Sequence, residues 1–371
     1  MSGNMGKGLR GLVPRRILLT IFIFGALFLV LLFLGLFLDN GRGSEKEVRV
    51  YSYGDYVDPA VVEDFEKETG IKVILDTFDT NEEMYPVIKN HAGVYDVICP
   101  SDYMVERLRK EGLLQKIDYS KIPNVKYIGE RYLKIADGSY DPGNQYSVPY
   151  QFGVAGIMYN TKKIPKGSIT SWSDLWNPKY RGKMLMQDSL RDTLMVGLKL
   201  HGHSLNSARE ADLKEAVDSL IDQKKLVYKF ANDSARDLLI GGSADLGVVW
   251  NGEVLYSRDL NPDLDFVIPK EGTELFVDNW CIPENAFHKE NAEKWINYLC
   301  RPEVAKKNFD YLTYTTPNEA ARKMLPAEVR NDPAIFVPSS ALEKSEVLRE
   351  LGSEANDLYS RYWKMYKSSN K

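Results

Sequence analysis

Residues 48–56 read VRVYSYGDY, a stretch that alternates apolar and polar side chains and then breaks at Gly54. Such alternation predicts a β-strand that ends near Tyr53. The strand end presents the rings of Tyr53 and Tyr56 beside the carboxylate of Asp55. Aromatic faces attract ammonium groups and a carboxylate supplies the counter-charge, so this end has the chemistry to hold an organic cation. The ordinary alternative is a surface turn, because strands favour tyrosine in any case.

Helix and strand signals alternate along the chain beyond this stretch. Asp58 and Pro59 mark the start of a helix and Gly70 marks its end, in agreement with the residue preferences of helix boundaries. Further strands are predicted at 71–78 and 95–100, and further helices at 82–91 and 102–111. Alternation at this spacing predicts a parallel α/β sheet with helices on both faces. Because about 325 of the 371 residues follow the N-terminal segment, we expect two lobes rather than one core.

The N-terminal segment has the features of a signal anchor. Residues 1–16 are basic, and 17–38 form an almost wholly apolar run long enough to span a bilayer once as a transmembrane helix. The flanking positive charge places 1–16 in the cytoplasm and the remainder outside, with 39–47 as a tether. A cleaved signal peptide is the competing interpretation, although no small-x-small cleavage site follows the run.

The net charge narrows the class of binding partner, and the cysteine spacing indicates the state of the thiols. Without the four N-terminal basic residues, 44 Lys and Arg face 52 Asp and Glu, so the exported part carries about −8. This balance argues against nucleic acid as a partner and favours cationic ligands. Cys99, Cys281 and Cys300 have no motif spacing, and we expect buried free thiols.

Sequence motifs for catalysis are absent or misplaced. Residues 6–11 match the spacing of a dinucleotide-binding loop, but they follow no strand and precede the apolar run. No nucleophile elbow, Walker loop or His-Glu-x-x-His occurs, and only His201 and His203 are close enough to suggest a metal. We therefore predict a protein that is not an enzyme, with no catalytic residues, metal or cofactor. A glycosidase built on two carboxylates alone stays open.

Aromatic residues and acids recur together at other predicted strand ends and turns. Trp250 precedes Glu253 after a very apolar strand, and Phe276 precedes Asp278. Singly, each is explained by core packing or a solvated cap. Several acids among apolar walls, however, call for a cation to neutralise them. In parallel α/β sheets the turns at 53–56 and 101–103 would both lie where ligands bind, beyond the carboxyl ends of the strands.

Four motifs resemble the extracytoplasmic polyamine-binding proteins of ABC importers, the spermidine/putrescine-binding proteins. Residues 53–56 stand where that family usually has Trp-(Ser/Thr)-(Asp/Glu)-Tyr, and the other matches are DVICPSDY at 96–103, SWSDLW at 171–176 and YTTPN at 314–318. The likeness runs from about residue 48 to residue 366.

The resemblance implies a two-lobed periplasmic-binding-protein fold of type II, each lobe a mixed sheet flanked by helices. Lobe 1 would comprise 48–150 and 276–313, and lobe 2 would comprise 151–275 and 314–371. Trp250 and Phe276 would sandwich the methylene chain, while Asp278 and other acids would bind amines. The implied ligand-binding residues are Tyr53, Asp55, Tyr56, Ser101, Tyr103, Asp192, Trp250, Glu253, Phe276, Asp278 and Tyr314.

The implied function is capture of putrescine or spermidine and its delivery to an ABC permease with its ATPase. The protein would be a monomer in the periplasm or on the outer face of the membrane, held there by its N-terminal helix. Tyr53, Gly54 and Ser189 depart from the family pattern, and Glu253 matches putrescine-type sites, so the choice between diamine and triamine stays open. Other open alternatives are a binder of another solute, a polyamine-sensing adaptor and a cell-surface enzyme.

Overall fold

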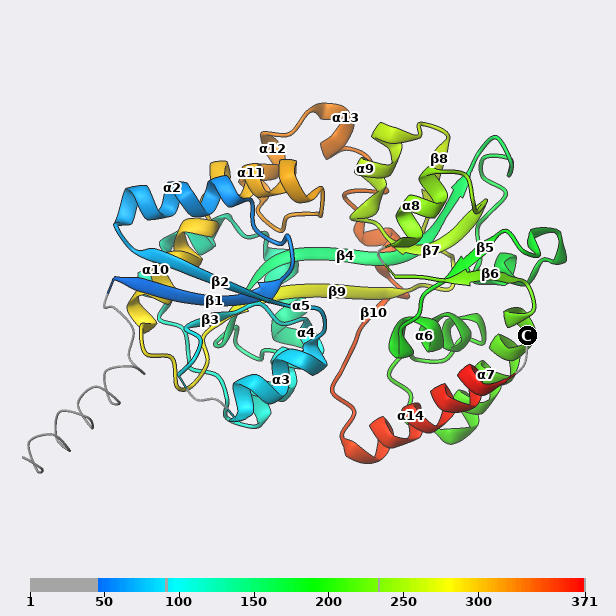
Figure 1. The fold of residues 1–371 in the computed structure, drawn as a ribbon, viewed down its shortest axis with the longest axis horizontal. Helices are drawn as coiled ribbons and strands as arrows, with labels where there is room; N and C mark the ends of the chain where they lie inside the picture. Colours follow the sequence, from blue (N-terminus) through cyan, green and yellow to red (C-terminus); the bar gives the residue numbers. More distant parts are fainter. Residues whose placement is uncertain (1–45, 91–92, 233, 370–371) are drawn as a thin grey trace, which may run out of the picture. The chain divides into compact units, whose positions relative to one another are not determined.

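Two long antiparallel strands, β4 and β9, organise the fold in the computed structural model, which describes residues 46–90, 93–232 and 234–369. The strands follow the order β2-β1-β3-β9-β4-β7-β5-β6, with β10 paired to β9 and β8 paired to β4 (Figure 1). Their bounds are β1 (Glu47–Tyr53), β2 (Lys72–Phe78), β3 (Val97–Ile98), β4 (Ser147–Asn160), β5 (Met184–Met186), β6 (Val227–Phe230), β7 (Leu246–Trp250), β8 (Leu264–Val267), β9 (Glu274–Cys281) and β10 (Glu346–Val347).

Strand β4 belongs to both halves of this sheet. Its first part, 147–154, pairs with β9, and its last part, 155–160, pairs with β7 and β8. One lobe is therefore built on β2-β1-β3-β9-β4 and the other on β4-β7-β5-β6, as the predicted two-lobed α/β fold requires. The lobe boundaries at residues 150, 275 and 313 stay a prediction.

Strand β9 makes the sheet mixed. β1 pairs in parallel with β2 and β3, and β5 pairs in parallel with β6 and β7, as helix–strand alternation predicts. β9 then inserts between β3 and β4 and runs antiparallel to both. The mixed sheet implied by the resemblance is thus confirmed, whereas the parallel pairing predicted from alternation does not extend to β9, a strand far along the chain that returns to the first lobe.

Helices cover the sheet. In Figure 1, α2 lies on one side of β1 and β2, and α3 and α4 lie on the other. Their bounds are α2 (Pro59–Thr69), α3 (Asn81–Asn90), α4 (Asp102–Lys110), α5 (Glu130–Gly138), α6 (Leu190–Leu200), α7 (Glu210–Lys224), α8 (Ser234–Ile240), α9 (Glu253–Leu260), α10 (Lys289–Leu299), α11 (Pro302–Leu312), α12 (Glu319–Lys323), α13 (Ala327–Arg330) and α14 (Ser353–Ser368). Short 3-10 helices occupy Tyr119–Lys121, Pro123–Tyr127, Trp172–Trp176, Pro178–Tyr180 and Ser339–Leu342.

The boundaries of α2 confirm the capping prediction. The Asp58 side chain accepts a hydrogen bond from the Ala60 N–H at 2.8 Å, which satisfies one of the donors left free in the first turn. Pro59 is the first helical residue, and Gly70 ends the helix with a φ of 68°. The positive φ explains why glycine stands there, since other residues adopt this conformation at a cost.

Buried apolar residues form two clusters: the larger fills the first lobe and extends to α8, α9 and β8 of the second, and the other packs α6, α7 and α14 against β5. Cys99, Cys281 and Cys300 are buried free thiols, as predicted. The predicted transmembrane helix at 17–38, with its flanks at 1–16 and 39–45, lies outside the described residues. Within the described part of the chain, no helix combines the length and apolarity needed to cross a membrane.

Candidate functional site

The carboxyl end of β1 and the start of α4 meet at Asp278 of β9. The Ser101 hydroxyl donates a hydrogen bond to Asp278 Oδ1 at 2.6 Å, and the Tyr56 hydroxyl donates to Asp278 Oδ2. The Tyr53 hydroxyl lies 2.9 Å from Ser101 Oγ. Ser101 makes no side-chain cap for α4, because its hydroxyl is directed to Asp278 instead. Three predicted ligand-binding residues from the first lobe thus converge on a fourth.

Asp278 is a buried carboxylate beside which the described part of the chain places no cation. Its side chain is 5% exposed, and no lysine, arginine or histidine of the described residues forms an ion pair with it. Burial raises the pKa of Asp278 from 3.8 to about 6, although the hydrogen bonds from Ser101 and Tyr56 oppose the shift. Burial also raises the pKa values of Tyr53 and Tyr56 well above the ordinary value for tyrosine, so both hydroxyls stay protonated. The group can therefore attract a cation.

A row of aromatic rings extends from this carboxylate. The ring of Tyr56 lies 5.2 Å from that of Tyr53 and 6.4 Å from that of Tyr314. The Phe276 ring lies 6.3 Å from Tyr314. Trp250 ends β7 opposite Ala155 of β4 and is partly buried. These rings provide apolar surface with π faces, which suits methylenes next to ammonium groups.

Two glycines that were not among the predicted site residues allow these rings to pack on the backbone. A Cβ at Gly153 of β4 would lie 2.3 Å from the Phe276 ring, and one at Gly252 would lie 2.5 Å from the Tyr314 ring. Glycine inside a strand often marks such close approach, so Gly153 could have been found from the sequence.

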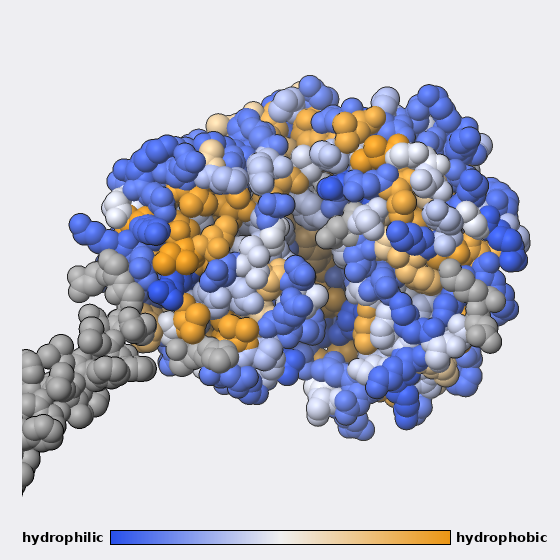
Figure 2. Space-filling view, viewed as in Figure 1, coloured by the Kyte–Doolittle hydropathy of each residue, from blue (hydrophilic) through white to orange (hydrophobic). Residues whose placement is uncertain are grey.

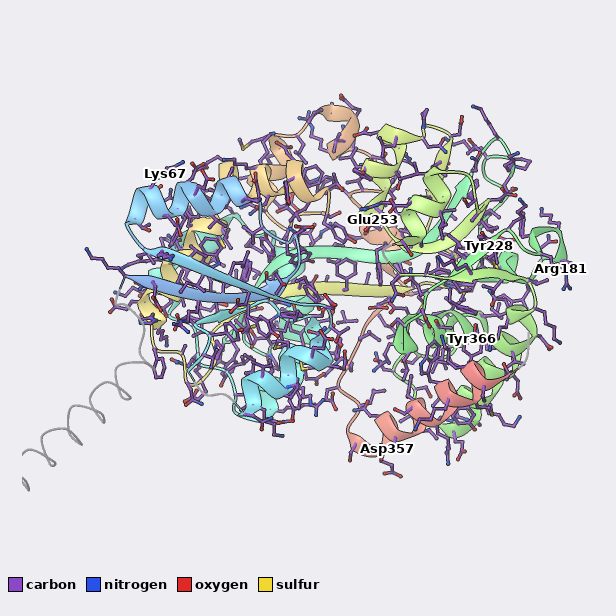
Figure 3. All side chains as sticks on the ribbon, viewed as in Figure 1. Lys67, Arg181, Tyr228, Glu253, Asp357 and Tyr366 are labelled. Carbon is purple, nitrogen blue, oxygen red and sulfur yellow. The ribbon has the colours of Figure 1, made fainter. Side chains whose placement is uncertain are left out.

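Glu253 has protein partners that the sequence did not indicate. It begins α9, beside the central strands in Figure 3. Its carboxylate pairs with Arg236 at 2.8 Å and accepts a hydrogen bond from the Tyr314 hydroxyl at 2.8 Å. Arg236 of α8 thus already neutralises Glu253. The predicted pairing of Glu253 with a ligand amine stays a prediction.

The remaining predicted residues, Asp55, Tyr103 and Asp192, make no hydrogen bond with Asp278 among the described residues. Asp55 is exposed at the turn with a φ of 51°, a conformation that Asp tolerates. The Tyr103 hydroxyl donates to Glu82 of α3 at 3.0 Å. Asp192, in the first turn of α6, lies beside Glu274 of β9, an acid that sequence reasoning did not single out. Glu274 could have been found from its position, because it lies two residues before Phe276 and four before Asp278 and therefore on the same face of the strand.

The space-filling view shows the face in Figure 2 hollowed between the two lobes. The residues that meet at Asp278 come from the end of β1, the turn after it and the N-cap of α4, whereas Trp250 and Glu253 come from β7 and α9 of the second lobe. Tyr314 links the two sets, because its hydroxyl donates to Glu253 and its ring lies 6.4 Å from that of Tyr56.

The chain is similar to known proteins over most of its length. The family model described as bacterial extracellular solute-binding protein matches residues 60–337. The spermidine/putrescine-binding periplasmic protein of Salmonella typhimurium is 39% identical over 86% of this chain and 90% of its own length, and that of Escherichia coli is 38% identical with the same coverage. A solved spermidine/putrescine ABC transporter substrate-binding protein from Streptococcus pneumoniae covers 88% of this chain and 100% of its own, with a TM-score of 0.79 and 34% identity.

Proposed function

The chain belongs to the bacterial extracellular solute-binding protein family, and we propose that it captures a protonated polyamine, putrescine or spermidine, between its two lobes. It is a solute-binding protein of the polyamine ABC importer family rather than an enzyme, because its relatives and fold neighbours are binding proteins. The enzyme alternative is thereby set aside. A binder of a neutral or anionic solute is disfavoured by the charge at Asp278.

The observation that carries this proposal is the uncompensated carboxylate of Asp278. A buried charge without a partner is costly, and an ammonium group placed against it would remove that cost. The hydroxyls of Tyr56 and Ser101 already hold the carboxylate in position. The aromatic row beside it would cover the methylenes of the same ligand.

The free energies of these contacts are large enough for specific binding. A charge-assisted hydrogen bond contributes about 1.5–3 kcal/mol and a desolvated cation–π contact about 2 kcal/mol. Two ammonium groups held in this way contribute about 7–10 kcal/mol before ordering costs, which is of the order of the roughly 8 kcal/mol of a micromolar complex.

Ligand binding would couple to lobe closure. The lobes share β4, and β9 runs beside it, so a ligand touching both lobes favours a conformation in which they approach. Closure would exclude water and present the loaded form to an ABC permease with its ATPase. We propose further that the protein acts as a monomer and that residues 17–38 hold it at the outer face of the membrane.

A thermal-shift and calorimetry panel tests the proposal. Putrescine, spermidine and spermine should each be compared with a neutral sugar and with ferric citrate. At least one polyamine is expected to raise the Tm and to bind with micromolar affinity or better, and the sugar and the iron complex are expected to do neither. The absence of a shift with every polyamine would overturn the proposed function.

A further inference from the structure

A small cavity lies beside β4 and β9 in the first lobe. Its lining residues come from these two strands, from α10 and α11 and from adjoining loops, and all of them are buried. The volume open to the centre of a water molecule is about 10 Å³. This is close to the space that a single buried water needs.

Three polar atoms of the residues that line this cavity have no hydrogen-bond partner in the part of the chain that the structure describes. They are Gln151 Oε1, Trp280 Nε1 and Asn308 Nδ2, and each of the three residues is 1% exposed. A buried polar group is costly unless it is hydrogen-bonded, and native proteins satisfy most such groups with protein or ordered water. Three of them at one cavity call for a bound molecule that satisfies all three.

The hydrogen-bonding character of the three atoms selects the kind of molecule. The Trp280 indole can only donate, and Asn308 Nδ2 is the donor of its amide because Asn308 Oδ1 accepts the Asp58 N–H at 2.9 Å. Gln151 Oε1 can only accept. A metal ion or an ammonium group cannot accept from the two donors, and an anion cannot donate to the carbonyl oxygen. Water does both, and it commonly makes about three such bonds when buried.

Strand β4 has a β-bulge at this cavity. Gln151 pairs with Asp278 of β9 and Pro149 pairs with Asn279, so Tyr150 is the extra residue between them. Bulges of this kind redirect side chains and are frequent beside functional sites. The cavity therefore adjoins the backbone that carries Asp278.

Residues of the cavity wall also hold the turn that presents Tyr56. The Tyr150 hydroxyl donates to the Tyr56 carbonyl at 2.7 Å, and Asn308 Oδ1 holds the Asp58 N–H. The Tyr56 hydroxyl in turn donates to Asp278. A molecule that fixes Asn308 and the bulge therefore also fixes the position of Tyr56.

We propose that Gln151, Trp280 and Asn308 bind one buried water molecule. The water accepts hydrogen bonds from the Trp280 indole and the Asn308 amide, and it donates one to Gln151 Oε1. By holding Asn308 and the bulge, it positions Tyr56 against Asp278 without touching the ligand. The site itself does not depend on the proposed function, whereas its effect on polyamine affinity rests on it.

A crystal structure of the full-length protein, at a resolution that shows ordered water, tests the site directly. One water is expected within hydrogen-bond distance of Gln151 Oε1, Trp280 Nε1 and Asn308 Nδ2. A cavity without density for water, or side chains that turn to protein partners instead, would overturn the proposal.

Gln151→Met and Trp280→Phe test the positioning role by calorimetric titration with putrescine and spermidine. Each variant removes one partner of the water, and either supplies the measurement if the other does not fold. Polyamine affinity is expected to fall by about threefold or more, because Tyr56 is held less firmly against Asp278. Gln223→Met is the matched control and should leave the affinity unchanged. Gln223 of α7 is also buried, and its Oε1 likewise has no partner among the described residues.

A double-mutant cycle with Tyr56→Phe separates positioning from a general structural effect. Tyr56→Phe removes the hydroxyl through which the water acts, so adding Gln151→Met should then cost little further affinity. The same loss in both backgrounds, or wild-type affinity in Gln151→Met and Trp280→Phe, would overturn the positioning role. Failure of the wild type to bind any polyamine would instead overturn the proposed function, and the crystal structure would still decide the water site.

Discussion

At the scale of single residues, Asp278 combines a functional charge with a cost in stability. Its pKa is raised above the ordinary 3.8, so the folded chain binds the proton more tightly than the unfolded chain. The free energy of unfolding of the ligand-free protein therefore falls as pH rises from about 4 through about 6. Above that range the ionised carboxylate is present and destabilises the fold, while being ready for a cation.

Asp278→Asn is expected to lower polyamine affinity by about tenfold or more, because one charge-assisted hydrogen bond is lost. The Tm of the ligand-free variant near neutral pH should equal or exceed that of the wild type, since the buried charge is gone. Calorimetric titration and scanning calorimetry measure the two effects. Asp357→Asn on the exposed side of α14 (Figure 3) is the matched control. Wild-type affinity in Asp278→Asn would refute the assignment.

Binding should also weaken in acid. Polyamine nitrogens, like the lysine amine, stay protonated in this range, but Asp278 becomes neutral below about pH 6. Each further pH unit should then lower the affinity by up to about tenfold. Dissociation constants measured from about pH 7.5 to about pH 5 check this, and the slope should be shallower in Asp278→Asn. A wild-type affinity that is constant over this range would contradict the role of Asp278.

The sequence analysis grouped the residues whose type and whose position at a strand end or turn both indicate a ligand site. Tyr53, Tyr56 and Asp278 were expected together and lie together. Glu274 was missed because an acid on a strand usually indicates a solvated face. The pairing of Glu253 with Arg236 was also missed, since the two residues lie on different helices that only tertiary packing brings together.

At the scale of elements, β4 is shaped by the absence of a side chain at Gly153. Gly153→Ala would place a Cβ 2.3 Å from the Phe276 ring and 2.7 Å from Asn251 Oδ1. We expect a loss of about 1–3 kcal/mol in stability, together with weaker polyamine binding as Phe276 is displaced. Thermal melting and titration measure both. Gly54→Ala, whose Cβ would meet no atom within 4 Å, is the stability control, and equal melting of the two variants would contradict the packing argument.

Element boundaries were predictable where local chemistry decides them. The cap at Asp58 and the left-handed Gly70 of α2 are readable from the sequence alone. The place of β9 was not, because its partners β3 and β4 lie more than a hundred residues earlier in the chain. The sequence of such a strand does not indicate the strands with which it pairs.

At the scale of the whole molecule, an ion pair joins α4 of the first lobe to the segment that leads into α14. Arg349 donates to both oxygens of Glu106, at 2.9 and 2.8 Å, and the Arg349 amide is held by Asn206 beyond α6. Burial alone would raise the pKa of Glu106, but hydrogen bonds from Arg349 and Lys110 outweigh it and lower the pKa to about 2. The stabilisation is therefore present above about pH 4.5 and is lost as pH falls toward about 2.

Glu106→Gln should lower the free energy of unfolding near neutral pH by up to about 3 kcal/mol, because it leaves Arg349 without its counter-charge. Denaturant titration at neutral and at acid pH measures the loss, which should shrink as the pH falls toward 3. Glu328→Gln, at an exposed acid of α13, is the control. A loss that does not change with pH would show that the ion pair is not its cause.

The position of β9 between β3 and β4 also constrains when the protein can fold. During synthesis β1, β2 and β3 appear first, yet the strand that joins them to β4 is missing until residues 274–281 have followed. The first lobe therefore cannot reach its native state while much of the second lobe is still to come, and contacts that distant in the chain form slowly. Delayed folding of this kind keeps the chain unfolded for longer, which suits a protein that crosses a membrane before it functions.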